Sequence, residues 1–228
     1  MPGFDIRFQV PSNLLAVGPT SCGKTSWLKK LVQNRHDLFS SVPSHMILFY
    51  KQSQKDYHEM EKMMNCGRTG ISFAKFDTLP ESVEDMKEIL ERFPKFSPKL
   101  IVFDDYLEEV GSLLKHFFTV LTHHYNCFTI FLCQNLFSAK SELRTLSINS
   151  QYMVLFNNPR DRSAITHLAK QVFPGNVHAL TNAYASATNE KPYGYLLLDF
   201  HQRQHSRVRL RSHIYPEEYP MRAYNIPI

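Results

Sequence analysis

The chain has 228 residues, of which 43% are hydrophobic, and this length suits one sizeable core better than two independent ones. The net charge of +5 favours contact with a polyanion such as nucleic acid, but it is too small to establish that contact. No run of about 18 uncharged apolar residues exists, and Asp5 and Arg7 interrupt the N-terminal stretch, which argues against a membrane span and a secretory signal. We therefore expect a soluble, intracellular protein with no membrane partner.

Cysteine usage agrees with a reduced, intracellular setting, and neither cysteines nor histidines form a complete metal-binding pattern. The chain has four cysteines, Cys22, Cys66, Cys127 and Cys133. They form no C-x-x-C pair. Two groups could be imagined as metal ligands, His201 with His205 and His123 with His124 and Cys127. Neither offers four ligands at useful spacing, so we expect no structural zinc.

Short apolar runs alternate with amphipathic segments along the chain. The expected strands are residues 14–17, 46–50, 71–76, 100–103, 128–133 and 152–156. The expected helices are residues 24–33, a segment with Tyr57, Met60, Met63 and Met64 on one face, then 81–93, 110–125, 165–173 and 177–187, with a short helix or loop at 141–148. Residues 193–200 and 208–215 resemble a closing strand pair.

This alternation predicts an α/β fold with a mostly parallel sheet and helices on both faces, because strands that are apolar on both sides need a helical layer on each. We expect one domain over residues 1–228. Its core would span about residues 10–200, followed by a basic C-terminal strand and tail at about 201–228.

The strongest motif is G-P-T-S-C-G-K-T at residues 18–25, which follows an apolar strand and opens a helix. It matches G-x-x-x-x-G-K-[ST], whose backbone N–H groups cradle phosphates. Lys24 would reach the β and γ phosphates, and the Thr25 hydroxyl would ligate Mg²⁺. The residues predicted to bind the nucleotide, ATP, are Gly18, Pro19, Thr20, Ser21, Cys22, Gly23, Lys24, Thr25 and Ser26. Cys22 could be a reactive thiol, but a small loop filler is the favoured interpretation.

A second motif, K-L-I-V-F-D-D at residues 99–105, carries two carboxylates to the end of a buried strand, where such sheets bind ligands. It resembles a Walker B motif. Asp104 would hold Mg²⁺ through its water shell, and Asp105 would polarise the water that attacks the γ phosphate. Taken alone, the pair could equally be solvated turn residues. Glu108 and Glu109 are nearby alternatives that are better explained as exposed helix-start charges.

The next strand ends in Gln134, a candidate sensor of the γ phosphate that could otherwise be a structural cap. Between the phosphate loop and the acidic motif lies an intervening strand, at residues 71–76 or 46–50. An inserted strand favours the additional-strand, RecA-like NTPases, which place an acidic catalyst after the metal carboxylate. The predicted class is therefore a three-layer P-loop NTPase, in which Asp105 is the acidic side chain that polarises the attacking water.

Several blocks together resemble a known family. They are G-P-T-S-C-G-K-T, L-I-V-F-D-D-Y, F-L-C-Q-N-L-F, N-S-Q-Y-M-V-L-F-N-N-P-R-D and P-Y-G-Y-L-L-L-D. The set resembles the FtsK/HerA-like genome-packaging ATPases of large eukaryotic DNA viruses, of the Maverick, Polinton and adintovirus type, which are related to the poxvirus packaging ATPase. The resemblance covers about residues 10–215, and its later blocks are not general P-loop features.

The resemblance implies an ATPase ring that threads double-stranded DNA into a preformed capsid. The implied partners are that DNA, further copies of the chain, and capsid portal or vertex proteins. The implied location is the host nucleus or a cytoplasmic assembly site, with possible virion association. Gln134 matches the family's glutamine, whereas Asp105 stands where many relatives of the wider superfamily have glutamate. An arginine finger from a neighbouring subunit is also implied; Arg144 is favoured modestly over Arg160 and Arg162.

The densest basic region follows the closing strand pair. Arg207, Arg209 and Arg211 alternate with apolar residues, so on a strand they would share one face. That face would either follow a DNA backbone or be the solvated side of an edge strand that charge protects from pairing. The sequence does not choose between these alternatives.

Two other functions remain open at this stage. A nucleoside or nucleotide kinase has a compact P-loop fold of similar length, but the candidate arginines fall where they would make a poor lid. A nucleotide-gated switch that binds DNA or a partner would use the same phosphate loop. Phosphate transfer to nucleosides without DNA would identify the kinase, and retained partner function in Asp105→Asn would identify the switch.

Overall fold

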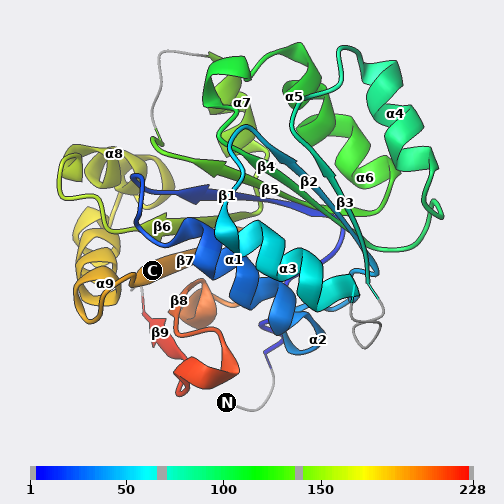
Figure 1. The fold of residues 1–228 in the computed structure, drawn as a ribbon. Coiled ribbons are helices and arrows are strands. Elements are labelled where there is room, and N and C mark those ends of the chain that lie inside the picture. The colour runs from blue at the N-terminus through cyan, green and yellow to red at the C-terminus, as the bar shows by residue number, and fades with distance from the viewer. Residues whose placement is uncertain (1–3, 66–70, 137–140, 226–228) are drawn as a thin grey trace.

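The computed structural model describes residues 4–65, 71–136 and 141–225. Within these residues the strands form one nine-stranded sheet in the order β3-β2-β4-β5-β1-β6-β7-β8-β9, with helices on both faces (Figure 1). The strands are β1 Ser12–Val17, β2 His45–Tyr50, β3 Ser72–Phe76, β4 Lys99–Asp104, β5 Cys127–Cys133, β6 Tyr152–Phe156, β7 Tyr195–Asp199, β8 Leu210–Ser212 and β9 Arg222–Tyr224. The α-helices are α1 Lys24–Gln33, α2 Arg35–Leu38, α3 Lys55–Asn65, α4 Val83–Glu91, α5 Ser112–His116, α6 Thr122–His124, α7 Ser141–Ile148, α8 Arg162–Val172 and α9 Val177–Asn189.

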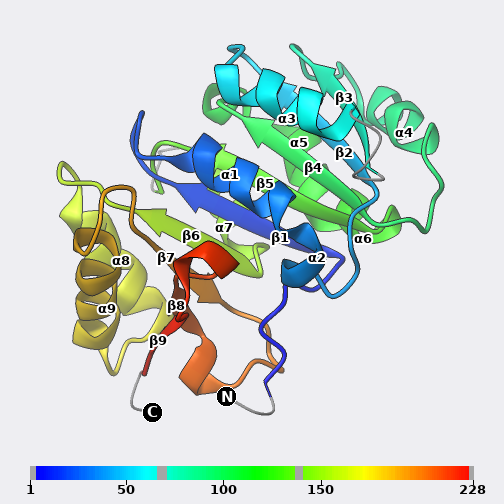
Figure 2. The same ribbon diagram turned by 60° about the horizontal axis from the view of Figure 1, so that its bottom comes forward.

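Strand residues alternate between two hydrophobic cores, one on each face of the sheet. In β1, Leu14 belongs to the core that contains residues of α1, α2 and α3, whereas Leu15 belongs to the core that contains residues of α4, α5, α7, α8 and α9. This alternation follows from the period of two in a strand. Figures 1 and 2 show α1 and α3 side by side over one face. The predicted three-layer α/β arrangement is therefore confirmed.

Local sequence signals explain the helices that flank these strands. Ser82 caps α4 by accepting a hydrogen bond from the backbone N–H of Asp85, whose carboxylate binds the Ser82 N–H in return. The predicted helix at 110–125 is interrupted by a π-helical turn, Phe117–Leu121. There the Phe118 carbonyl accepts a hydrogen bond of 2.8 Å from the side-chain amide of Asn13. Such a bond gives the widened turn a contact to the sheet.

The order of the strands corrects one prediction. Neither residues 46–50 nor residues 71–76 separate the phosphate-loop strand from the acidic strand, because both lie on the far side of β4. The inserted strand is β5, which pairs in parallel with β1 on one side and β4 on the other. The prediction of an additional-strand sheet holds. The inserted strand, β5, follows the acidic motif in the chain, because chain order and sheet order differ in a doubly wound fold.

The closing strand pair is confirmed, since β7 and β8 are antiparallel, but the basic segment is not the exposed strand that was predicted. Arg207 lies in a 3₁₀ turn, Ser206–Val208, and β8 begins only at Leu210. Arg211 is buried, with Nη2 2.9 Å from Oδ2 of the buried Asp199. The predicted arginine face is therefore wrong at Arg211, because an acidic partner on β7 holds that charge inside the protein. A further strand, β9, covers the outer side of β8.

Candidate functional site

The phosphate loop connects β1 to α1 in the arrangement that the motif predicts. The Gly18 N–H donates a hydrogen bond of 3.1 Å to the Cys133 carbonyl at the end of β5, which fixes the start of the loop. Gly23 ends the loop with φ of 101°, a conformation that favours glycine. No side chain caps α1 and its first turn holds no acidic residue. The positive end of the helix dipole is therefore left for a ligand anion.

Six of the nine predicted loop residues line a pocket with a volume of about 680 Å³. These six are Thr20, Ser21, Gly23, Lys24, Thr25 and Ser26. Gly18, Pro19 and Cys22 do not line it. A Cβ on Gly18 would lie 2.6 Å from Cys22 Sγ, so the thiol fills the space beneath the loop. Burial raises the pKa of the Cys22 thiol, which keeps it protonated and agrees with the filler interpretation.

The Lys24 ammonium group lies against its own loop. Its Nζ donates hydrogen bonds of 2.6 Å to the Gly18 carbonyl and 3.0 Å to the Pro19 carbonyl. These carbonyl oxygens satisfy a charge that would otherwise face the pocket. A bound phosphate would compete with them for the same ammonium group.

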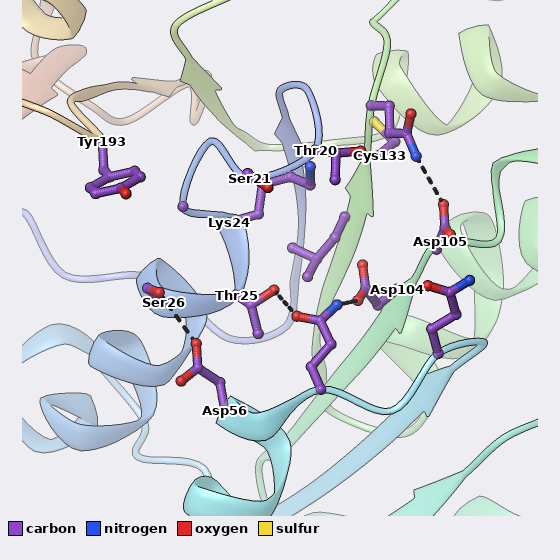
Figure 3. Close-up of a pocket in the computed structure, with 15 residues that line it drawn as sticks. Thr20, Ser21, Lys24, Thr25, Ser26, Asp56, Asp104, Asp105, Cys133 and Tyr193 are labelled. Carbon is purple, nitrogen blue, oxygen red and sulfur yellow. Dashed lines mark hydrogen bonds between the residues drawn. The ribbon is translucent and has the colours of Figure 1, made fainter.

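Thr25 and Asp104 are joined by a third residue, Gln54. The Thr25 hydroxyl donates to Gln54 Oε1 at 2.8 Å, and Gln54 Nε2 donates to Asp104 Oδ2 at 3.1 Å. Tyr57, from α3, also donates its hydroxyl to Asp104 Oδ2. One amide therefore spans the two oxygen ligands predicted for Mg²⁺, as the dashed lines beside Thr25 and Asp104 in Figure 3 show.

The environment of Asp104 opposes its ionisation. The side chain is only 6% exposed, and this burial raises the pKa of its carboxyl, while the Tyr57 hydrogen bond acts in the opposite direction. Burial and the nearby Asp104 charge both raise the pKa of Tyr57, so its hydroxyl remains a donor. A buried carboxylate gains most from a cation. The hydroxyl of Thr25 and the carboxylate of Asp104 are hard oxygen donors one amide apart, which fits Mg²⁺.

Asp105 and Gln134 meet at the same sheet edge. Gln134 Nε2 lies 3.4 Å from Asp105 Oδ1, and both residues line the pocket. Asp105 is exposed and adopts φ of 65°, which turns the chain sharply away from β4. A non-glycine residue in this region is uncommon, although aspartate tolerates it better than most. The two predicted catalytic side chains are thus brought together at the ends of adjacent strands.

The arginine candidates are not part of this pocket. Arg144 lies on α7, Arg160 follows β6, and Arg162 begins α8. All three are exposed, and none of them lines the pocket in the described part of the chain. Within one subunit, the predicted finger does not reach the phosphate loop.

The sequence did not mark as site residues four polar residues that line the pocket, Gln52, Gln54, Asp56 and Tyr193, nor Tyr57, which contacts Asp104. Asp56 accepts a hydrogen bond of 3.3 Å from the Ser26 hydroxyl, so α3 faces the first turn of α1. Gln54 and Asp56 closely follow the carboxyl end of β2, which pairs with β4, so polar residues after β2 were the available signal. Tyr193 lies in the turn between α9 and β7 and had no such signal.

The structure bears on membrane spans and on the cysteines only within the residues that it describes. No helix among residues 4–65, 71–136 and 141–225 is long and apolar enough to cross a bilayer. Cys22, Cys127 and Cys133 are free thiols in the structure. Cys66 and Phe137, the last residue of the Q-N-L-F block, lie outside the described residues.

Comparison with solved structures finds the same fold. The genome packaging NTPase B204 from Sulfolobus turreted icosahedral virus 2, in complex with ATP-gammaS, matches with a TM-score of 0.50 and 11% identity over 83% of this chain and 93% of that chain. The same NTPase in complex with AMPPCP gives a TM-score of 0.51 and 10% identity, covering 96% and 99% of the two chains. No family model and no curated protein sequence matches this chain. At these identities the likeness establishes the fold.

Proposed function

We propose that this chain is a Mg²⁺-dependent ATPase of the FtsK/HerA type that moves double-stranded DNA into a viral capsid. The observation that carries the proposal is the meeting of three side-chain sets at one sheet edge: the loop with Lys24 and Thr25, the carboxylates Asp104 and Asp105, and the amide of Gln134. Phosphates need cationic and N–H donors, a metal ion needs oxygen ligands, and the attacking water needs a carboxylate to orient it. The three sets of side chains supply these groups. The likeness in fold to a viral packaging NTPase supports the same function.

Each residue has a distinct role in the proposed hydrolysis. The loop N–H groups and Lys24 bind the phosphates, and Thr25 and Asp104 hold Mg²⁺, which neutralises charge on the phosphate oxygens when bound. Asp105 orients and deprotonates the attacking water. Gln134 holds the Asp105 carboxylate in place and senses the γ phosphate through the same amide.

The proposal includes a homo-oligomeric ring because the pocket is incomplete in one chain. No arginine lines it among the described residues, whereas phosphoryl-transfer sites often place an arginine on the γ phosphate. The exposed Arg144, Arg160 and Arg162 are available to a neighbouring subunit's pocket. Mixing Lys24→Ala with an arginine variant tests this. Activity should return only if the arginine acts on a neighbouring subunit's pocket, because the intact loop of one variant can then meet the intact arginine of the other.

The partners follow from the same proposal. Double-stranded DNA would be the translocated polyanion, and the net charge of +5 is favourable for it. Capsid portal or vertex proteins would anchor the ring during virion assembly, in the host nucleus or at a cytoplasmic assembly site. Arg203 and Arg207 remain exposed for DNA contact, while Arg211 is withdrawn into the core.

The decisive experiment measures ATP hydrolysis against protein concentration, with and without double-stranded DNA. We expect turnover to rise with assembly and again with DNA, and Lys24→Ala to abolish it. Absence of turnover in both conditions, at concentrations where the chain assembles, would refute the proposal. Transfer of phosphate to a nucleoside without DNA would instead identify a kinase.

A further inference from the structure

The pocket has two chemically different ends. Asp105 lies at one end and Tyr193 at the other, with Lys24 and Thr25 between them (Figure 3). A phosphate chain bound at Lys24, with its γ phosphate toward Asp105, therefore directs its remaining part toward Tyr193. In a nucleoside triphosphate that part carries the sugar and the base.

Tyr193 is held at this end at an energetic cost. Its φ is 62°, in the left-handed region that bulky residues rarely adopt, and its side chain is 68% exposed. A Cβ added to Gly23 would lie 3.0 Å from Tyr193 Cβ, so the turn before β7 rests directly on the last residue of the phosphate loop. Strained backbone conformations tend to persist where function requires them.

There is also space beside the ring. Tyr193 lines the phosphate pocket and also a second cavity of about 180 Å³, which shares Gly23 and Ser26 with it. The hydroxyl of Ser26, in the first turn of α1, already donates to Asp56. The charged side chains of this second cavity are already engaged, because Lys30 and Lys191 both pair with Glu218. The flat, exposed face of the Tyr193 ring is therefore the feature that the cavity offers to a base.

From this geometry we infer that Tyr193 is the platform on which the base of the bound nucleotide stacks. The inference rests on the proposed nucleotide-binding function and adds the recognition of the base to it. An aromatic face attracts the π face of any base, and a purine covers more of it than a pyrimidine. The site would accordingly select purine nucleoside triphosphates by stacking area.

The test compares ATP with inorganic tripolyphosphate, which has the phosphates but no base. Calorimetry with Mg²⁺ measures the dissociation constants of both ligands for the wild type, Tyr193→Ala, Tyr193→Phe and Phe96→Ala. Phe96 is a matched control because its ring is 84% exposed and precedes the amino end of β4, away from the pocket. Thermal unfolding checks that each variant is folded.

We expect Tyr193→Ala to raise the dissociation constant for ATP roughly tenfold, the scale of stacking one base on a ring, and to leave that for tripolyphosphate unchanged. Tyr193→Phe and Phe96→Ala should bind both ligands as the wild type does. Unchanged ATP binding by Tyr193→Ala, or an equal loss for both ligands, would overturn the inference and leave the proposed function standing. A wild-type chain that binds neither ligand would overturn the proposed function and the inference with it.

Discussion

The side-chain amide of Gln54 donates a hydrogen bond of 3.1 Å to Asp104, the buried carboxylate at the end of β4. The same amide accepts from Thr25, so Gln54 occupies the path between the two residues assigned to Mg²⁺. In the proposed enzyme, metal binding requires Gln54 to release at least one of these bonds. Tyr57 donates to Asp104 independently of Gln54, so it can keep Asp104 oriented while Gln54 moves.

We predict that Tyr57→Phe weakens Mg²⁺ binding at the site. Loss of the donated hydrogen bond removes the larger of the two effects that lower the pKa of Asp104, the other being the Lys24 charge. The pKa then rises further under the effect of burial, so the carboxylate becomes a poorer metal ligand. The Mg²⁺ concentration for half-maximal ATP binding should rise about tenfold, and more at lower pH. Tyr125→Phe is the control, because its hydroxyl donates to the remote Glu91 at 2.9 Å. Equal Mg²⁺ titrations for the two variants would contradict the role of Tyr57.

We predict that Asp105→Asn separates binding from hydrolysis. Asparagine preserves the size and the turn, and it tolerates the φ of 65°, but it cannot accept a proton from water. ATP affinity should stay near that of the wild type, while single-turnover hydrolysis falls by roughly 10²–10⁴-fold. Glu108→Gln removes a neighbouring carboxylate that does not line the pocket, and should hydrolyse ATP normally. If Glu108→Gln shows the larger loss, the catalytic carboxylate has been misassigned.

The phosphate loop and the strand at residues 152–156 could be predicted because their signals are local. The loop is one continuous motif, and β6 is a continuous apolar run with the predicted bounds. Each can be recognised without knowing which segment lies beside it. The same holds for α1, whose bounds also match the prediction.

The residues that were missed or misplaced depend on neighbours distant in the chain. Gln54 reaches Asp104 only because β2 and β4 pair in parallel, and Arg211 is buried only because β7 brings Asp199 beside it. A periodic pattern reports which face of an element is apolar, but it does not report which element lies alongside. The inserted strand was misassigned for the same reason, since sheet order is not chain order.

We predict that Gly18→Ala disturbs the loop by crowding. The added methyl group would lie 2.6 Å from Cys22 Sγ and 2.7 Å from Phe156 Cβ, closer than van der Waals contact allows. Overpacking of this kind lowers the free energy of unfolding by about 1–3 kcal/mol. Urea denaturation measures it, with Gly175→Ala as control because no atom lies within 4 Å of that added carbon. Similar midpoints for both variants would show that the loop relaxes without cost.

We predict that the Asp199–Arg211 pair stabilises the C-terminal strands more than an exposed pair does. Asp199→Ala leaves the buried Arg211 charge without its carboxylate, which should lower the free energy of unfolding by about 3–5 kcal/mol. The matched control is Glu190→Ala, which removes an exposed pair with Arg222 at 2.6 Å and should cost less than about 1 kcal/mol. Equal losses in urea denaturation would mean that Arg211 is solvated in spite of its burial.

The stabilisation by Asp199 should also depend on pH. Burial raises the pKa of this carboxyl, but the hydrogen bond from His201 and the charge of Arg211 outweigh it, so the pKa is lower than the ordinary 3.8. A group with a lowered pKa stabilises the folded state fully above its ordinary value, and loses that contribution as the pH falls through the folded value. The difference between wild type and Asp199→Ala should therefore be largest near about pH 7 and shrink below about pH 4. A difference that grows on acidification would show that the carboxyl is protonated in the native state.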